Sequence, residues 1–302
     1  MVGWSTTNAT YILYECEVAS HTAINSTLDH MNKKSILCFV LVALFSLLNV
    51  AEAADIKVSH NAKGRADTGL FYGQIVAGDT QRFAKFFIKY PAVMLLKIDS
   101  RGGDVTEAIR IGELVRALRI QVDVADRGVC ASSCFFIWMN GSYRLAVEEN
   151  YRGGSGPVGL HRPFFVNPEN YEGSLQRQSN AMVGIRNYLE SNLIPRRLID
   201  IMMSRPSNEI YWLTFMDLEE INPIPPALEE LFIAKCQGNI RQLSAQLQQA
   251  NIKNDSQEKA RVEGQLREVF DCTNDLNFDA HVAAIIKLEA GWLPPVPFKA
   301  GK

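Results

Sequence analysis

A short, almost wholly apolar segment constrains the fold of this chain more than any other feature. Residues 92–98 are apolar except for Lys97, and Gly102 and Gly103 follow shortly after the run. A run of this length and composition is typical of a strand that is buried on both faces. Such strands belong to parallel sheets that are covered by helices, so the segment predicts an α/β protein.

The flanking segments repeat an alternation of strand and helix. This rhythm predicts stacked βαβ units over residues 54–222, followed by a helical C-terminal extension over residues 223–302. A proline-rich break at residues 222–226 separates the two parts. Strands are expected at 70–75, 92–98, 120–125, 143–147, 158–161 and 210–214, and helices at 80–89, 105–118, 131–139, 171–189, 194–203 and 215–221. Residues 228–236 and 240–270 are expected to be mostly helical.

The N-terminal region has the pattern of an export signal. Residues 31–34 form a short basic stretch, residues 36–50 are an apolar run, and residues 51–53 have the small-x-small form of a cleavage site. Cleavage is expected between Ala53 and Ala54, which would place the mature protein in the bacterial periplasm. Residues 1–30 do not resemble a signal, so we expect translation to start at Met31 and residues 1–30 to be an artefact of the assigned start.

An alternative is an uncleaved anchor in the inner membrane, formed by residues 36–50. This run is shorter than the about 20 apolar residues that a bilayer span needs, which favours cleavage. Apart from this N-terminal segment, no membrane contact is expected.

Four cysteines remain after the signal, in a compartment where disulfides persist. Cys236 and Cys272 flank a helical stretch and are expected to form a disulfide. Cys130 and Cys134 would lie too far apart for a disulfide if both belonged to one helix, so a bond between them requires Cys130 to lie outside the helix. A zinc site is the other interpretation of this spacing, but no second ligand pair is evident, and no metal is predicted.

Charge and composition exclude one class of partner. The chain of 302 residues has a formal net charge of -2 and an ordinary hydrophobic fraction of 47%. It contains no run of lysine and arginine. Nucleic acid is therefore not an expected partner.

Two segments offer a nucleophile and donors for an oxyanion. Ser132 is expected at the start of the helix over residues 131–139, near the positive end of the helix dipole. The N–H group of Ser133 would be open to an oxyanion, and an N–H group of Gly102 or Gly103 is the expected second donor. The alternative is structural, because a serine at this position can simply cap the helix.

A histidine is the expected base. Of the three histidines that follow the signal, His60 lies near the new N-terminus and His281 lies in the C-terminal helices. His161 stands at the end of an expected strand, directly before Arg162 and Pro163. A serine nucleophile needs a base that takes its proton, so Ser132 and His161 form the candidate pair. Alternatively, His161 is a packed or surface histidine.

Together these segments resemble the proteolytic subunit of the Clp protease and its broader ClpP/crotonase superfamily. The family's segments Ser-Pro-Gly-Gly, Ala-Ala-Ser-Met and His-Gln-Pro correspond here to residues 100–103, 130–133 and 161–163. More closely, the chain is similar to exported ClpP-like proteins of bacteria, which combine a signal peptide with a Cys-x-Ser-x-Cys segment. The resemblance covers residues 70–222. It implies a ClpP-like spiroid fold and peptide hydrolysis by Ser132 and His161.

The third member of a triad is where the chain departs from the family. The family places an aspartate just before a strand like residues 211–214, and this alignment falls on Ile210, which cannot orient an imidazole. The neighbouring Asn208 and Glu209 are the candidates, since an amide or a carboxylate can orient the base. They are otherwise residues of a surface loop. Loss of the carboxylate would cost up to roughly 10⁴-fold in kcat, so the site is a full triad, a weak dyad or a relic.

The resemblance thus implies a serine peptidase-type hydrolase that needs no cofactor, acts on a peptide or protein substrate and forms homo-oligomers. Three other interpretations stay open. A Ser-Lys dyad would need a well-placed lysine, and Lys97 lies in the buried strand. An acyl-CoA enzyme of the crotonase type would use the same oxyanion loop without a Ser/His pair. A catalytically inactive, exported binding module would keep only the fold.

Overall fold

The computed structural model describes residues 54–60, 64, 66–146, 155–163 and 171–298. The predicted upstream segment, signal peptide and cleavage site in residues 1–53 lie outside the described residues. No helix in the described ranges is long and apolar enough to cross a membrane.

Two sheets form the framework. The larger sheet has the strand order β1-β2-β3-β4-β6, in which β1 is antiparallel to β2 and the other neighbours are parallel. The smaller sheet has the order β5-β7-β8, with β7 parallel to β5 and antiparallel to β8. The strands are β1 (Asp55–His60), β2 (Ala66–Tyr72), β3 (Leu95–Asp99), β4 (Gln121–Val124), β5 (Cys130–Ala131), β6 (Arg144–Leu145), β7 (Ser155–Leu160) and β8 (Tyr211–Thr214).

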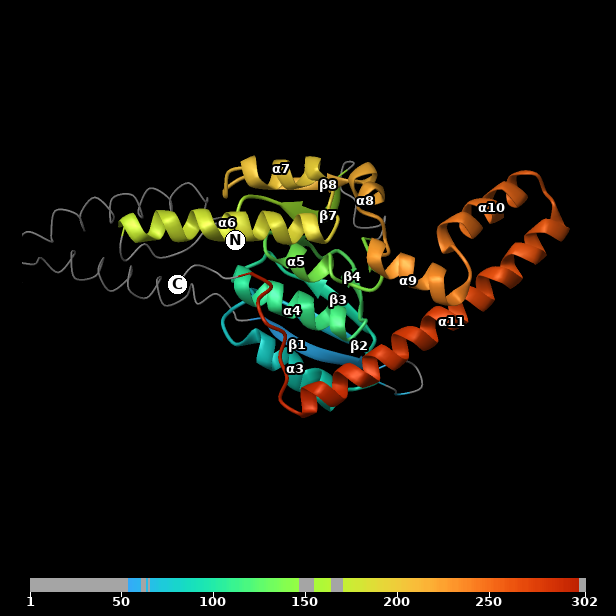
Figure 1. Cartoon of the computed structure of the whole chain (residues 1–302), viewed down its shortest axis with the longest axis horizontal. Coiled ribbons are helices and arrows are strands. Elements are labelled where there is room, and N and C mark those ends of the chain that lie inside the picture. Colours follow the sequence, from blue (N-terminus) through green and yellow to red (C-terminus); the bar gives the residue numbers. More distant parts are fainter. Residues whose placement is uncertain (1–53, 61–63, 65, 147–154, 164–170, 299–302) are drawn as a thin grey trace, which may run out of the picture. The chain divides into compact units, whose positions relative to one another are not determined.

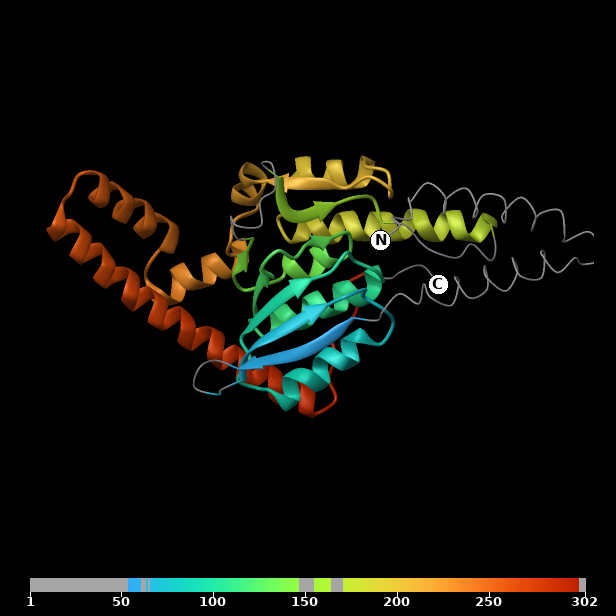
Figure 2. The same cartoon turned by 180° about the vertical axis from the view of Figure 1, so that it is seen from behind.

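Helices follow the strands and cover the larger sheet. Figures 1 and 2 show α3 and α4 on the same side of this sheet, where their apolar faces join the main core. The predicted α/β class with a helical C-terminal part is confirmed. The helices are α3 (Asp79–Lys89), α4 (Val105–Ala117), α5 (Cys134–Trp138), α6 (Tyr171–Ser191), α7 (Arg196–Ser204), α8 (Phe215–Ile221), α9 (Pro226–Cys236), α10 (Ile240–Ile252) and α11 (Ser256–Glu289).

The expected helix over residues 131–139 was wrong at its start. Ser132 has a φ of 57°, which a residue in a right-handed helix cannot have. Ala131 still belongs to β5, and α5 begins only at Cys134 and spans five residues. The dipole of so short a helix is small, so the argument that placed Ser132 at its positive end does not hold.

The expectation that residues 240–270 are mostly helical is confirmed, and the structure divides this stretch between two helices. Asn254 has a left-handed φ of 53°, which ends α10 just beyond Ile252. Asp255 then caps α11 by accepting hydrogen bonds from the N–H groups of Gln257 and Glu258. The second helix continues to Glu289, well beyond the predicted end.

The far end of α11 packs into the main core rather than standing apart from it. Ala284, Ile285 and Leu288 are buried with residues of the α/β layers. The ring of His281 is buried, and its two nitrogens lie 2.7 Å and 2.8 Å from the carbonyl oxygens of Leu118 and Pro91. These contacts attach α11 to the loops that precede β3 and β4.

A disulfide joins the C-terminal end of α9 to α11. The Cα atoms of Cys236 and Cys272 are 5.7 Å apart, and the two residues are separated by 36 positions in the chain. Cross-links of this kind restrict the unfolded chain, in proportion to the logarithm of the loop length.

We expect the double substitution Cys236→Ala with Cys272→Ala to lower the free energy of unfolding by about 4 kcal/mol, because a closed loop of this length is released. Urea denaturation of the oxidised protein and the variant measures the difference. A loss below about 1 kcal/mol would mean that the bond adds little beyond the helix packing.

A network around Asp217 fixes β8 and the start of α8. The buried Asp217 carboxylate accepts hydrogen bonds from the Thr214 N–H at 2.8 Å, the Thr214 hydroxyl at 2.9 Å and the Tyr211 hydroxyl at 3.0 Å. It also pairs with Arg197 of α7. Burial alone would raise the pKa of Asp217, but the hydrogen bonds from Arg197, Thr214 and Tyr211 hold it below the ordinary value of 3.8.

Substitution of Asp217→Asn is expected to lower stability at pH 7 by about 1–3 kcal/mol, because charge-assisted hydrogen bonds are lost. The folded-state pKa is depressed, so this stabilisation is present above pH 3.8 and is lost as the pH falls through the folded-state value. Thermal unfolding of both proteins from pH 7 to pH 2.5 should therefore show converging melting temperatures. Curves that stay parallel would show that the carboxylate charge contributes nothing.

Candidate active site

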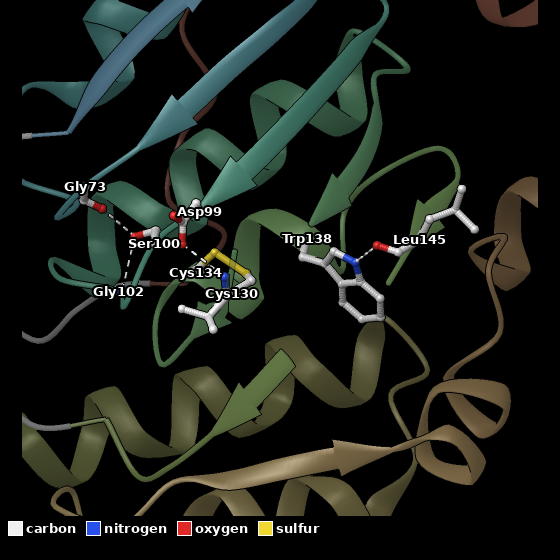
Figure 3. The surroundings of a disulfide bond; sticks show 9 residues. Gly73, Asp99, Ser100, Gly102, Cys130, Cys134, Trp138 and Leu145 are labelled. Carbon is white, nitrogen blue, oxygen red and sulfur yellow. Dashed lines mark hydrogen bonds between the residues drawn. A yellow bond between two sulfur atoms is a disulfide. The ribbon is translucent and has the colours of Figure 1, made fainter. Parts of the chain in front are cut away.

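Ser100 ties the predicted oxyanion loop to two other segments, at Gly73 and at residues 129–131, and Figure 3 shows its contacts with Gly73 and Gly102. Its N–H group donates to the Val129 carbonyl at 2.7 Å, and its own carbonyl accepts from the Ala131 N–H at 2.9 Å. Its hydroxyl donates to the Gly73 carbonyl at 2.7 Å and accepts from the Gly102 N–H at 3.1 Å. The loop is thereby held against the segment that leads into Ser132.

The two glycines of this loop differ in what their N–H groups do. The Gly102 N–H donates to the Ser100 hydroxyl. On either side of Gly103, the Gly102 carbonyl accepts from the Ile75 N–H and the Asp104 N–H donates to the Ile75 carbonyl, both at 2.9 Å. This pattern turns the N–H of the intervening Gly103 away from Ile75. Within the described residues the Gly103 N–H has no acceptor. Of the two predicted donors, Gly103 is the one that remains open.

Ser132 occupies a sharp turn between β5 and α5. Its backbone is left-handed, its N–H donates to the Gly159 carbonyl at 2.9 Å, and its carbonyl accepts from the Phe135 N–H at 3.1 Å. The side chain is half-buried. A serine on a strained strand-to-helix turn presents its hydroxyl at the end of a sheet, which is how nucleophilic serines of many hydrolases are held.

Gly102 packs directly against this turn. A Cβ atom added at Gly102 would lie 2.7 Å from the Ser132 Cβ atom and 3.0 Å from the Ser133 backbone nitrogen. Gly102 also has a φ of 100°, a backbone region that favours glycine. The oxyanion loop and the Ser132 turn, which are far apart in sequence, therefore meet at this glycine.

Ser133 offers a second open donor beside the first. The residue is buried, and neither its N–H nor its hydroxyl has a partner among the described residues. Buried polar groups nearly always have a hydrogen-bond partner in folded proteins. The N–H and the hydroxyl of Ser133, which have none here, therefore need an explanation. The Gly103 and Ser133 N–H groups, on either side of the Gly102 contact, together could serve the oxygen of a bound carbonyl group.

The register of the smaller sheet brings His161 to the same end as Ser132. Ala131 of β5 is paired with Gly159 of the parallel strand β7, so Ser132 and His161 leave neighbouring strands at the same end. His161 is buried, with 7% of its surface exposed. The two candidate residues are thus brought into one region by the fold.

The His161 ring has a backbone partner that sequence reasoning missed. Its Nδ1 atom lies 2.9 Å from the Arg162 carbonyl oxygen. Because a carbonyl can only accept, Nδ1 carries the hydrogen, and in the neutral ring Nε2 carries the lone pair. No side-chain pattern could have revealed this contact, since any residue at position 162 supplies a carbonyl.

Asn208 and Glu209 lie in the exposed turn before β8. The Glu209 carboxylate is 3.3 Å from the Arg205 guanidinium, while the Arg205 carbonyl accepts from the Arg162 N–H at 3.0 Å. The turn is therefore attached to the residue that follows His161. Its carboxylate, however, is paired with Arg205 at the surface.

A second disulfide encloses Ser132. Cys130 and Cys134 are bonded, their Cα atoms are 5.2 Å apart, and both residues are fully buried (Figure 3). Cys130 lies in β5, outside the helix, as a bond at this spacing requires. With both sulfur atoms in the bond, this pair does not provide thiolate ligands for zinc.

Comparison with known proteins adds a likeness to solved structures. No protein-family model and no curated protein matches the chain. The solved structures include a mutant of the 1510-N membrane-bound stomatin-specific protease, with 11% identity and a TM-score of 0.35, covering 55% of this chain and 82% of that chain. They also include the enoyl-CoA hydratase EchA3 from Mycobacterium ulcerans Agy99, with 12% identity and a TM-score of 0.32, covering 78% and 98% of the two chains.

The two solved structures differ in activity, since one is a protease and the other is an enoyl-CoA hydratase. Likenesses at this level of identity and TM-score say nothing of the activity of this chain. The function is therefore argued from the geometry of its own residues.

The close approach at Gly102 can be tested with an alanine. Gly78→Ala is the matched control, because Gly78 also has a positive φ of 91° but has open space where a Cβ would lie. We expect Gly78→Ala to cost about 1 kcal/mol from backbone strain alone, and Gly102→Ala to cost several times more because three atoms of residues 131–133 must move. Urea denaturation measures both, and equal losses would contradict the packing of the loop against Ser132.

Proposed function

We propose that this chain is a serine hydrolase of the peptidase type. Ser132 is the nucleophile, His161 is the base, and the N–H groups of Gly103 and Ser133 receive the oxyanion. The observation that carries the proposal is the left-handed Ser132 turn packed against Gly102, between two N–H groups without acceptors in the described part of the chain. This is the set of groups that acyl transfer to a serine requires.

In the proposed reaction, His161 Nε2 takes the proton of the Ser132 hydroxyl as its oxygen attacks the carbonyl carbon of the substrate. The negative charge that develops on the carbonyl oxygen is stabilised by the Gly103 and Ser133 N–H groups. The imidazolium then returns its proton to the leaving amine, and the acyl group remains on Ser132. Water, deprotonated by the same ring, releases the acid and restores the serine.

The Arg162 carbonyl is proposed to do part of the work of a third triad member. It selects the ring tautomer in which Nε2 can accept a proton. A carbonyl carries only a partial negative charge, so it stabilises the imidazolium less than a carboxylate would. We therefore propose a Ser-His dyad with a slow chemical step, in which Asn208 and Glu209 have no direct part.

The surroundings proposed for this hydrolase are the bacterial periplasm or another exported location. Two disulfides, one of them wholly buried, support an oxidising compartment. A peptide or protein substrate and assembly into a homo-oligomer belong to the same proposal. No cofactor is required by the proposed steps.

A second candidate is an exported binding module without catalytic activity. The observation that favours it is the pairing of the Glu209 carboxylate with Arg205 at the surface. In this case Ser132 would be a structural residue of the turn.

A fluorophosphonate probe distinguishes the two candidates, because it reacts only with an activated serine. We expect the full chain to be labelled at Ser132, and His161→Ala to slow the labelling by about 10²–10⁴-fold through the loss of the general base. The exposed Ser207, in the turn before β8, provides a control: Ser207→Ala should be labelled at the rate of the unchanged protein. Peptide mapping identifies the labelled residue, and a folded protein that takes up no label would be a binding module.

The variant Glu209→Gln then separates a dyad from a triad. If Arg162 supplies the partner of the ring, the labelling rate should change by less than about threefold. A loss approaching 10⁴-fold would assign the orienting role to the carboxylate instead.

A further inference from the structure

We infer that the Cys130–Cys134 disulfide is a positioning element of the Ser132 turn, so that Ser132 reacts much faster while this pair is oxidised than after its reduction. The inference rests on the proposed function and adds a form of regulation to the same site. It would make the hydrolase depend on the redox state of its compartment.

The bond joins the two ends of the turn that holds the nucleophile. Cys130 is the first residue of β5 and Cys134 is the first residue of α5, and each lies two positions from Ser132. Their Cα atoms are held 5.2 Å apart. The direction in which the chain enters the turn is therefore coupled to the direction in which it leaves.

Apart from the disulfide, only non-covalent contacts hold the backbone of this turn in a left-handed conformation. Apart from glycine, residues avoid a φ of this sign, and Ser132 has a φ of 57°. Two hydrogen bonds act on Ser132 itself, to the Gly159 carbonyl and from the Phe135 N–H. The five-residue helix that follows is too short to be stable by itself. The covalent bond is thus the constraint that joins the two ends of this turn directly.

The same bond also affects the oxyanion donors. Gly102 contacts both the Ser132 Cβ position and the Ser133 nitrogen, so a turn that opens shifts the nucleophile and the Ser133 donor relative to Gly103. A displacement of about 1 Å at a catalytic group can lower a rate by about 10²-fold. Reactivity should therefore be more sensitive to this bond than overall stability is.

Reduction would open the turn. A dithiol reductant supplies two electrons and two protons, the Sγ–Sγ bond breaks, two thiols form, and the reductant becomes a disulfide. Both cysteines are fully buried in a close-packed core. Two thiol sulfur atoms repel at distances at which bonded sulfur atoms are stable, so the thiols need more room than the site offers.

The second disulfide provides a matched control within the same chain. Cys236 and Cys272 join α9 to α11, and neither is buried to the extent that Cys130 and Cys134 are. Its loss is expected to lower stability without moving Ser132. A comparison of the two pairs therefore separates positioning from general stabilisation.

The test measures the rate at which the fluorophosphonate probe labels Ser132 in the full chain. We expect Cys130→Ala with Cys134→Ala to be labelled about 10- to 100-fold more slowly than the unchanged protein. Cys236→Ala with Cys272→Ala should be labelled at the unchanged rate. The pH at which labelling is half-maximal should be the same in all three proteins, because His161 and its Arg162 partner are unaltered.

Stepwise reduction of the unchanged protein covers the case in which the Cys130/Cys134 variant does not fold. A mild reductant should open the more accessible Cys236–Cys272 bond first with no loss of labelling, as mapped by alkylation of the thiols. Labelling should fall only when Cys130 and Cys134 become alkylatable, and reoxidation before alkylation should restore it.

Three results would overturn the inference. Equal labelling rates in the unchanged protein and a folded Cys130/Cys134 variant would overturn it while leaving the proposed hydrolase intact. Equal slowing in both disulfide variants would show a general effect of stability. Absence of labelling in the unchanged, oxidised protein would instead refute the proposed function, and the inference with it.

Discussion

The hydrogen bonds of Ser100 are the interaction on which the site depends. Its N–H and its carbonyl bond to Val129 and Ala131 in the segment that leads to Ser132. Its hydroxyl donates to Gly73 and accepts from Gly102. Ser100 is buried, so water cannot replace these partners without a cost. The loop that follows β3 and the strand that leads to Ser132 are held together for this reason. Without that attachment the nucleophile and the oxyanion donors would belong to independent loops.

The candidate site is defined by the groups that this network leaves unpaired. Around Ser100 and Ile75 nearly every backbone group has a partner, while the N–H groups of Gly103 and Ser133 have none within the described ranges. Such groups are costly in a folded protein unless a ligand uses them. A carbonyl oxygen that becomes an oxyanion is a ligand that two neighbouring N–H donors can stabilise. These unpaired N–H groups are the reason for which we propose acyl chemistry at Ser132 rather than a purely structural serine.

Several parts of the fold could be predicted because they depend on local pattern. The apolar run at residues 92–98 contains most of β3, the stripe over residues 105–118 gives α4, and the predicted helix at residues 215–221 coincides with α8. Two helix boundaries were not predicted, and at each of them one residue adopts a left-handed backbone. Ser132 delays the start of α5, and Asn254 divides the long C-terminal helix. Serine does not announce that conformation, because contacts beyond the local sequence select it, whereas asparagine is one of the few residue types that adopt it readily.

The sequence by itself determined which residues can carry the chemistry: a serine between two cysteines, a pair of glycines after a buried strand and a histidine at a strand end. Only the tertiary structure decided how these groups act. In the folded chain the Gly102 N–H donates to Ser100, whereas the Gly103 N–H stays open among the described residues. His161 has the Arg162 carbonyl as a partner, and Glu209 is paired with Arg205. The physical reason is that residue type sets what a side chain can do, whereas a backbone hydrogen bond depends on which distant segments the fold brings together.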